Sequence, residues 1–160
     1  MSDVPSTSAD RRPLLTRQRV FAAALVAAVL VIGALWQRTH PYSIQTGADI
    51  EASPAEVWEV LTDYAAYPEW NPTQDGLDGA TVAMSVANET LRWETTTGLI
   101  GIFDGELTLT LEPLDGGGTR FTQSELFRGV LVPFAGESLK NETAPGFHAM
   151  NAALRERVER

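Results

Sequence analysis

The residues best suited to chemistry are Gln123 and Glu125, which stand two positions apart between Phe121 and Phe127. Residues two apart in a β-strand share a face, so these four side chains would point the same way. A carboxylate among aromatic rings is hard to ionise, because burial disfavours its charged form. We therefore predict that Glu125, with Gln123, anchors the hydroxyl or carbonyl group of a ligand in an apolar pocket. The alternative is that this face is solvated and Glu125 pairs with a neighbouring strand.

Other groups that commonly carry catalysis or bind metals are few. The chain has no cysteine, which excludes disulfides, thiolate nucleophiles and cysteine-bound zinc. His40 and His148 are too far apart in sequence for metal-ligand spacing, so we expect solvated histidines, no metal and no cofactor. No serine lies in the G-x-S-x-G context of a nucleophile elbow. These absences favour a binding protein over an enzyme.

The strand that carries Glu125 is expected to belong to an antiparallel sheet. Residues 102–112 alternate between an apolar face and a face of acidic and threonine side chains, so one face is covered and the other wet. The glycine-rich turn at residues 115–118 then returns the chain into a strand over residues 119–129. Alternating residues predict further strands near residues 44–50, 82–86 and 90–97.

Two helices are expected to flank the sheet. Ser53, Pro54 and Glu56 form a capping box with proline at the first helical position, so a helix begins there. Near the C-terminus, apolar positions at helical spacing form one stripe of Leu139, Thr143, Phe147, Met150, Leu154 and Val158. Proline interrupts a helix, so residues 145–146 should divide this region into a short segment and a longer main helix.

The residues around the helix start at Ser53 resemble the START-like SRPBCC, or polyketide cyclase/dehydrase, family. The resemblance covers roughly residues 42–159. Within residues 50–72 it is carried by Ile50, Ala52, Pro54, Val57, Trp58, Leu61, Asp63, Tyr67, Trp70, Asn71 and Pro72, and it continues at residues 91–93, 117–121, 125–129 and 146–151. It implies an α+β helix-grip fold, in which an antiparallel sheet curls around a long C-terminal helix and leaves an apolar cavity between them. The family implies no single activity.

The resemblance also suggests what could line that cavity. The expected ligand-binding residues are Trp58, Trp93, Phe103, Leu107, Leu109, Phe121, Gln123, Glu125, Phe127, Phe147 and Met150. We predict binding of a hydrophobic small molecule or lipid. One alternative is a polyketide cyclase-like enzyme in which Glu125 or Arg92 moves a proton. Another is a non-catalytic interaction module with a degenerate cavity, because residues 73–90 are shorter than the family's usual segment and predict a short sheet with an exposed edge.

An uncharged apolar run over residues 20–36 follows four arginines. We predict a single-pass transmembrane helix, with a cleaved signal peptide and a buried core helix as the alternatives. The arginines place the N-terminus in the cytoplasm and the domain outside it. Ala23/Ala27 and Ala24/Ala28 have the spacing that permits helix dimerisation, which allows a homodimer.

The chain is thus divided into a cytoplasmic disordered tail (residues 1–19), the membrane segment (20–36), a tether (37–41) and one domain (42–160). The net charge of the chain is −9. Residues 41–160 hold seven basic and nineteen acidic residues, which makes −12 for that part. Such an acidic domain repels phosphate backbones, so we expect no nucleic-acid partner.

Overall fold

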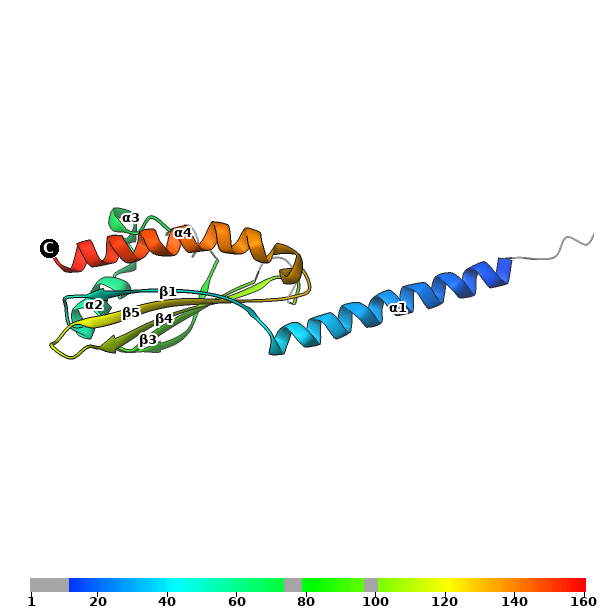
Figure 1. Ribbon diagram of the computed structural model, residues 1–160, viewed down its shortest axis with the longest axis horizontal. Helices are drawn as coiled ribbons and strands as arrows, with labels where there is room; N and C mark the ends of the chain where they lie inside the picture. Colours follow the sequence, from blue (N-terminus) through cyan, green and yellow to red (C-terminus); the bar gives the residue numbers. More distant parts are fainter. Residues whose placement is uncertain (1–11, 74–78, 97–100) are drawn as a thin grey trace, which may run out of the picture.

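The computed structural model describes residues 12–73, 79–96 and 101–160 and has an α+β architecture, as predicted. Figure 1 shows the elements, which follow in the order α1 (Arg12–Thr39), β1 (Tyr42–Ile50), α2 (Pro54–Thr62), the 3-10 helix η1 (Tyr64–Ala66), α3 (Tyr67–Trp70), β2 (Thr81–Val86), β3 (Thr90–Thr96), β4 (Asp104–Pro113), β5 (Thr119–Arg128) and α4 (Val132–Val158).

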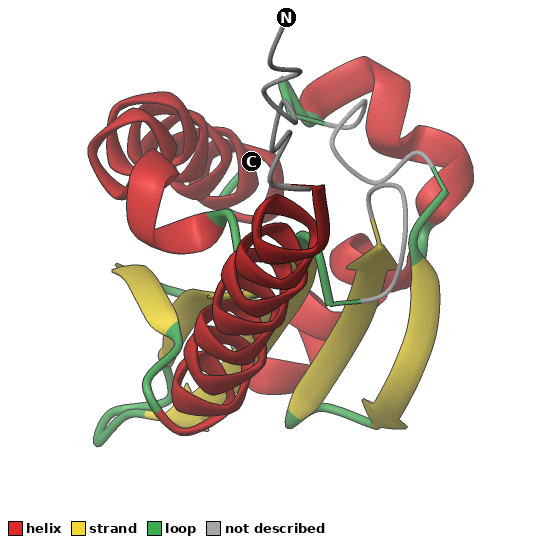
Figure 2. Cartoon of the chain, turned by 90° about the vertical axis from the view of Figure 1, so that its right-hand side faces the viewer, coloured by secondary structure: helices red, strands yellow, loops and turns green. Residues whose placement is uncertain are grey.

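The five strands form one antiparallel sheet in the order β1-β5-β4-β3-β2. Figure 2 shows the strands as a single curved layer. β5 lies between β1 and β4, and Glu125 pairs with Ile44 on one side and Leu107 on the other. The strand that carries the predicted anchor residues is therefore an interior strand, held in register from both sides.

The long C-terminal helix α4 lies along one side of this sheet (Figure 1). Its buried residues include Phe147, Met150 and Leu154, which belong to the predicted stripe. Phe147 joins one core cluster with Ile44, Phe127 and Val132. Met150 and Leu154 join the other, which also contains Ile50, Val57, Leu61, Leu91, Trp93, Leu109, Leu111 and Phe121. The arrangement of a sheet against a long C-terminal helix confirms the predicted helix-grip fold.

The predicted break in this helix at residues 145–146 is wrong. Pro145 lies inside α4, which runs unbroken over 27 residues. The pyrrolidine ring removes one backbone hydrogen bond, but the residue is exposed and Val132 before it and Phe147 after it are both buried. Packing of both halves against the same sheet keeps the helix continuous.

Helix α2 begins as the capping box predicts. The backbone N–H of Glu56 donates to Ser53 Oγ over 3.4 Å, and the Ser53 N–H donates back to Glu56 Oε2 over 2.8 Å. Val57 and Leu61 are buried against the core. The cap therefore sets the point at which the chain turns from β1 into the helix that closes one end of the core.

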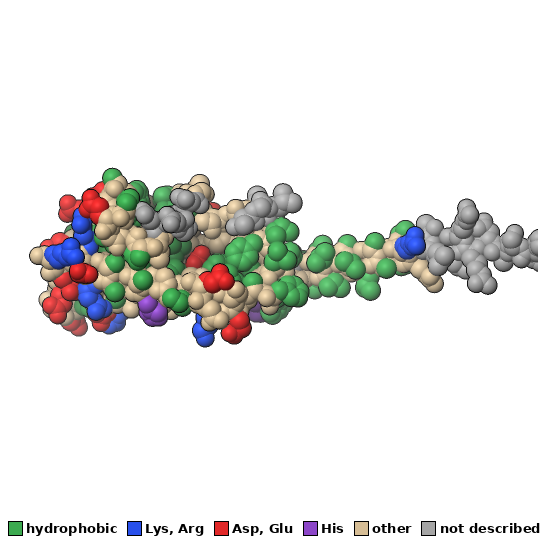
Figure 3. Space-filling model, turned by 90° about the horizontal axis from the view of Figure 1, so that it is seen from above, with side chains coloured by type: hydrophobic (Ala, Val, Ile, Leu, Met, Phe, Trp, Pro, Cys, Tyr) green, Lys and Arg blue, Asp and Glu red, His purple; other side chains and the backbone are tan. Residues whose placement is uncertain are grey.

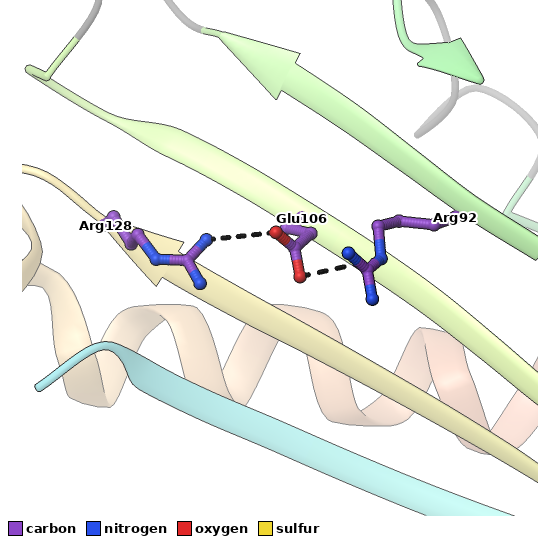
Figure 4. Close-up of polar contacts among 3 residues, drawn as sticks. All are labelled: Arg92, Glu106 and Arg128. Atoms are coloured by element: carbon purple, nitrogen blue, oxygen red, sulfur yellow. Dashed lines mark hydrogen bonds and ion pairs between the residues drawn. The ribbon is translucent and has the colours of Figure 1, made fainter. Parts of the chain in front are cut away.

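The sheet face opposite the cavity is polar and carries an ion triad (Figure 4). Glu106 of β4 lies between two arginines, with Arg128 Nη1 at 3.2 Å from Oε2 and Arg92 Nε at 3.8 Å from Oε1. Each residue comes from a different strand, so the triad connects β3, β4 and β5. Arg92 is thereby committed to this face of the sheet.

Helix α1 is present where the apolar run predicted a helix, but the prediction that it spans a membrane is wrong. No helix in the described part of the chain is long and apolar enough to cross a membrane. The apolar run has seventeen residues, or roughly 25 Å of helix, against a hydrocarbon core of about 30 Å. The predicted single-pass membrane localisation, with a cytoplasmic N-terminus and an extracytoplasmic domain, depended on that span and is therefore also wrong.

The ends of α1 also differ from the expected division of the chain. The predicted disordered tail covers residues 1–19, of which residues 1–11 lie outside the described residues and residues 12–19 are helical. The helix then continues into the predicted tether, as far as Thr39. The division into tail, tether and domain otherwise stays a prediction.

Strand β2 forms one edge of the sheet, and all six of its residues are exposed. This agrees with the exposed edge expected from the short segment at residues 73–90, of which residues 74–78 lie outside the described part. The sheet nevertheless keeps β1 and β5, which contact α4, and β3 and β4, which line a cavity together with it.

Candidate functional site

A cavity of about 330 Å³ lies between the sheet and α4. Its walls come from β3, β4, β5, α4 and the segment that follows α3. The lining residues are Asn71, Thr73, Trp93, Thr95, Leu107, Leu109, Gln123, Glu125, Phe127, Glu142, Thr143, Gly146, Phe147 and Met150. Ligand cavities in proteins typically begin at around 300 Å³ and are mostly apolar with a few polar groups, and this cavity has both properties.

The structure brings together eight of the eleven residues that the sequence suggested for the lining. These are Trp93, Leu107, Leu109, Gln123, Glu125, Phe127, Phe147 and Met150. The other three lie elsewhere. Phe121 is fully buried in the core, Trp58 packs against that core from α2, and Phe103 packs against Phe127 with ring centroids 5.6 Å apart. The role of the eight in binding a ligand stays a prediction.

Gln123 is held in one orientation by the helix above it. Its side chain is fully buried, and its Nε2 donates to the backbone oxygen of Phe147 over 3.2 Å and to Asn151 Oδ1. Asn151 Nδ2 in turn donates to Thr46 Oγ1 over 3.2 Å. A backbone oxygen can only accept, so Nε2 must face α4 and Oε1 must be the other amide atom. Among the described residues, Gln123 Oε1 has no hydrogen-bond partner.

Glu125 is half-buried in the cavity wall, as the strand alternation predicted. Burial raises the pKa of its carboxyl from the ordinary value of 4.5 to about 7. Gly105 lies on the neighbouring strand β4. A Cβ added there would stand 3.3 Å from Glu125 Oε1 and 2.6 Å from Thr95 Oγ1. The absence of a side chain at this position thus leaves room next to the carboxyl group.

Asn71 supplies a second buried amide that the sequence analysis did not assign to the site. It is 3% exposed, and its Oδ1 accepts hydrogen bonds of 2.9 Å from the backbone N–H and the hydroxyl of Thr73. Its Nδ2 is buried and has no partner within the described ranges. In the sequence, Asn71 stands out only as one of the residues that carry the family resemblance, so its burial and its place in the wall could not be read from it.

The sequence analysis also did not assign several smaller or polar lining residues to the site. They are Thr73, Thr95, Glu142, Thr143 and Gly146. Thr95 could have been found, because it stands two residues after Trp93 and shares its face in β3. Gly146 could not, since what matters there is the close approach of α4 to Thr73, whose Cγ2 would lie 3.1 Å from an added Cβ.

Arg92 does not belong to this cavity. It lies in the ion triad on the opposite face of the sheet (Figure 4), so the suggestion that it moves a proton in the pocket is wrong. Among the described residues no group of histidine, cysteine, aspartate and glutamate side chains could hold a metal ion. The titratable residues of the described cavity lining are therefore Glu125, which is half-buried, and Glu142, which is exposed.

A family model described as "Polyketide cyclase / dehydrase and lipid transport" matches residues 41–159. None of the curated proteins searched matches the chain. The matched range contains the whole sheet, α2, α3 and α4, and therefore all the residues that line the cavity.

Solved structures share the fold at low sequence identity. Protein CV1439 from Chromobacterium violaceum is 18% identical over 75% of this chain and 99% of that one, with a TM-score of 0.54. A START superfamily protein from Mycobacterium smegmatis is 20% identical over 73% and 97%, with a TM-score of 0.51. The di-domain ARO/CYC BexL of the BE-7585A biosynthetic pathway is 12% identical over 73% and 46%, with a TM-score of 0.55.

Proposed function

We propose that this chain, which belongs to the polyketide cyclase / dehydrase and lipid transport family, binds a hydrophobic small molecule or lipid in the cavity between the sheet and α4. The observation that carries the proposal is the cavity itself. A sheet and a helix that only needed to stabilise each other would close such a space, because each unfilled volume in a core costs free energy.

The lining supports an apolar ligand. Trp93, Leu109 and Phe147 are nearly fully buried and supply apolar walls, while Gln123, Glu125 and Asn71 are the amide and carboxyl groups of the buried or half-buried lining. Apolar walls with a small number of fixed polar atoms are typical of sites that take up a largely hydrophobic molecule and orient it. The cavity persists although the segment at residues 73–90 is short, which favours binding over an interaction module with a degenerate cavity.

The proposal is tested by filling the cavity from the helix side. Gly146→Leu adds a side chain to the cavity lining, with its Cβ 3.1 Å from Thr73 Cγ2, so the affinity for a neutral probe, 2-naphthalenemethanol, should fall at least tenfold in equilibrium dialysis. Ala149→Leu adds the same bulk to an exposed position of α4 and serves as the matched control. If the probe fails to bind the unaltered chain, or binds both variants alike, the cavity is not a ligand site.

A second candidate is proton-transfer catalysis of the polyketide cyclase kind, favoured by one observation. A carboxyl group whose pKa is about 7 can both donate and accept a proton near neutral pH. If Glu125 acts in this way, Glu125→Gln abolishes turnover of a poly-β-keto chain while the neutral probe still binds. Turnover that survives the substitution would reject this candidate and leave binding as the function.

A further inference from the structure

The cavity lining contains acidic residues and no basic residue among those described. Its titratable lining residues are Glu125 and Glu142, and neither lysine nor arginine lies among the lining residues. Two arginines of the strands that line the cavity, Arg92 and Arg128, are engaged by Glu106 on the opposite face (Figure 4). An anionic ligand would thus enter an apolar space that offers acidic groups and no cation to replace its hydration.

The hydrogen-bonding capacity of the cavity points to a particular kind of ligand group. Gln123 Oε1 is an acceptor that lacks a donor in the described structure, on a side chain with 0% exposure. The amide cannot turn to relieve this, because its Nε2 is held by the Phe147 backbone oxygen and by Asn151. A buried acceptor without a donor costs free energy, and a ligand that brings a donor recovers it.

A buried donor in the same wall adds to this pattern. Asn71 Nδ2 has no acceptor within the described ranges, and Asn71 is 3% exposed. Two residues of the lining thus carry, one each, a buried acceptor and a buried donor without a partner in the described structure. A hydroxyl group has one donor and two acceptor lone pairs and can serve either kind of atom, whereas an ether can only accept and a carboxylate also carries charge.

We infer that the cavity selects an uncharged, largely apolar ligand that carries a hydroxyl group, which donates to Gln123 Oε1, and that it rejects carboxylates such as free fatty acids. The inference rests on the proposed function, since it assigns the chemistry of the ligand that this cavity would hold. An ammonium group could also donate, but burying it against these apolar walls costs its hydration, so the neutral hydroxyl is favoured.

The test compares four naphthalene compounds of similar shape on the full chain by equilibrium dialysis at pH 7.5. They are 2-naphthalenemethanol, its methyl ether, 2-naphthoate and 2-naphthylmethylammonium. We expect the alcohol to bind about tenfold more tightly than the ether, because one hydrogen bond to a buried acceptor is lost. The carboxylate and the ammonium compound should both bind more weakly than the alcohol.

Two variants identify the groups responsible. Gln123→Leu should reduce the alcohol-to-ether preference from about tenfold to nearly one while the ether still binds. This variant also removes the contact to Asn151, so Glu125→Gln provides an independent measurement that leaves that contact in place. Removal of the acidic group should strengthen binding of 2-naphthoate about tenfold relative to the alcohol.

The outcomes distinguish failure of the proposed ligand binding from failure of the inferred selectivity. If none of the four compounds binds, the proposed function fails and the selectivity with it. If the ether binds as well as the alcohol, or if 2-naphthoate or the ammonium compound binds best, the cavity is a ligand site and the inferred selectivity is wrong. A preference for the alcohol that disappears in Gln123→Leu supports both.

Discussion

Glu125 combines a place in a ligand cavity with a disfavoured charge. The residue pairs with Leu107 on β4 and Ile44 on β1, and both neighbours are apolar. The resulting desolvation raises the pKa of the carboxyl to about 7. The folded chain therefore binds this proton more tightly than the unfolded chain does, which makes the free energy of unfolding depend on pH.

The sign of that dependence follows from the two pKa values. Below pH 4.5 the carboxyl is protonated in both states, and as the pH rises from 4.5 to 7 only the unfolded chain ionises, so the folded state loses stability. The loss is complete above pH 7 and amounts to roughly 3 kcal/mol, at 1.36 kcal/mol per pKa unit. Glu125→Gln should remove this loss, which urea unfolding at pH 4.5 and pH 8 measures.

The control for this prediction is Glu112→Gln, at an exposed position near the end of β4. It should keep the pH dependence of the unaltered chain. If Glu125→Gln and Glu112→Gln follow the same curve between pH 4.5 and pH 8, the carboxyl of Glu125 is not desolvated in the folded chain.

Gln123 shows how one residue can serve the fold and the site together. Through Nε2 it joins β5 to α4 at Phe147 and Asn151, and Asn151 continues the chain of contacts to Thr46 on β1. A buried network of this kind fixes the position of the helix over the sheet. The position of the unmet Oε1 is consequently set by the fold and does not require a ligand to arrange it.

At the scale of elements, α2 depends on its first turn. Ser53 and Glu56 satisfy each other's backbone N–H groups, and Val57 and Leu61 then reach the core. Ser53→Ala removes the side-chain acceptor and should lower the free energy of unfolding by about 1 kcal/mol, the usual worth of an N-cap. Ser43→Ala, at an exposed position of β1, is the control and should change stability by less than about 0.5 kcal/mol in urea unfolding. Equal effects of the two substitutions would show that the cap contributes nothing.

The elements differ in how far the sequence could predict them. The capping box, the alternation in β4 and β5 and the stripe on α4 are local patterns, and each appears in the structure as expected. The break at Pro145 was wrong, because the local rule for proline was overridden by packing along the whole helix. Local chemistry predicts where an element begins more reliably than whether tertiary contacts carry it across a break.

The sequence predicted which sheet face the site residues share, but not which of them lie in the cavity and which in the filled core. Alternation placed Phe121, Gln123 and Glu125 on one side of β5, and the structure agrees, but Phe121 is in the filled core while Glu125 is in the cavity. Which of two residues four positions apart meets a filled or an empty space depends on where α4 and the segment after α3 cross the sheet. Asn71 was missed for this reason, since its side chain enters the site from a segment distant in sequence.

For the whole molecule, the described chain consists of a sheet-and-helix body and a projecting helix α1 (Figure 1). On the face that Figure 3 shows, most charged side chains lie at the end of the body remote from α1, and hydrophobic side chains follow α1. The large hydrophobic residues of α1 whose side chains are described are between 53% and 73% exposed. The apolar run wrongly predicted a membrane span, because an uncharged run of that kind indicates a helix without specifying what surrounds it.

The exposure of α1 leads to a prediction about where stability resides. Residues that bury little apolar surface contribute little to the free energy of unfolding. The core clusters draw their members from residues 42–158 and include none of the α1 residues whose side chains are described. A chain of residues 41–160 should therefore unfold in urea within about 0.5 kcal/mol of residues 1–160, and bind 2-naphthalenemethanol with the same affinity. The contrasting variant is Leu154→Ala at a fully buried position of α4, which should cost at least about 2 kcal/mol. A loss of several kcal/mol on removing residues 1–40 would mean that α1 packs against the body in solution.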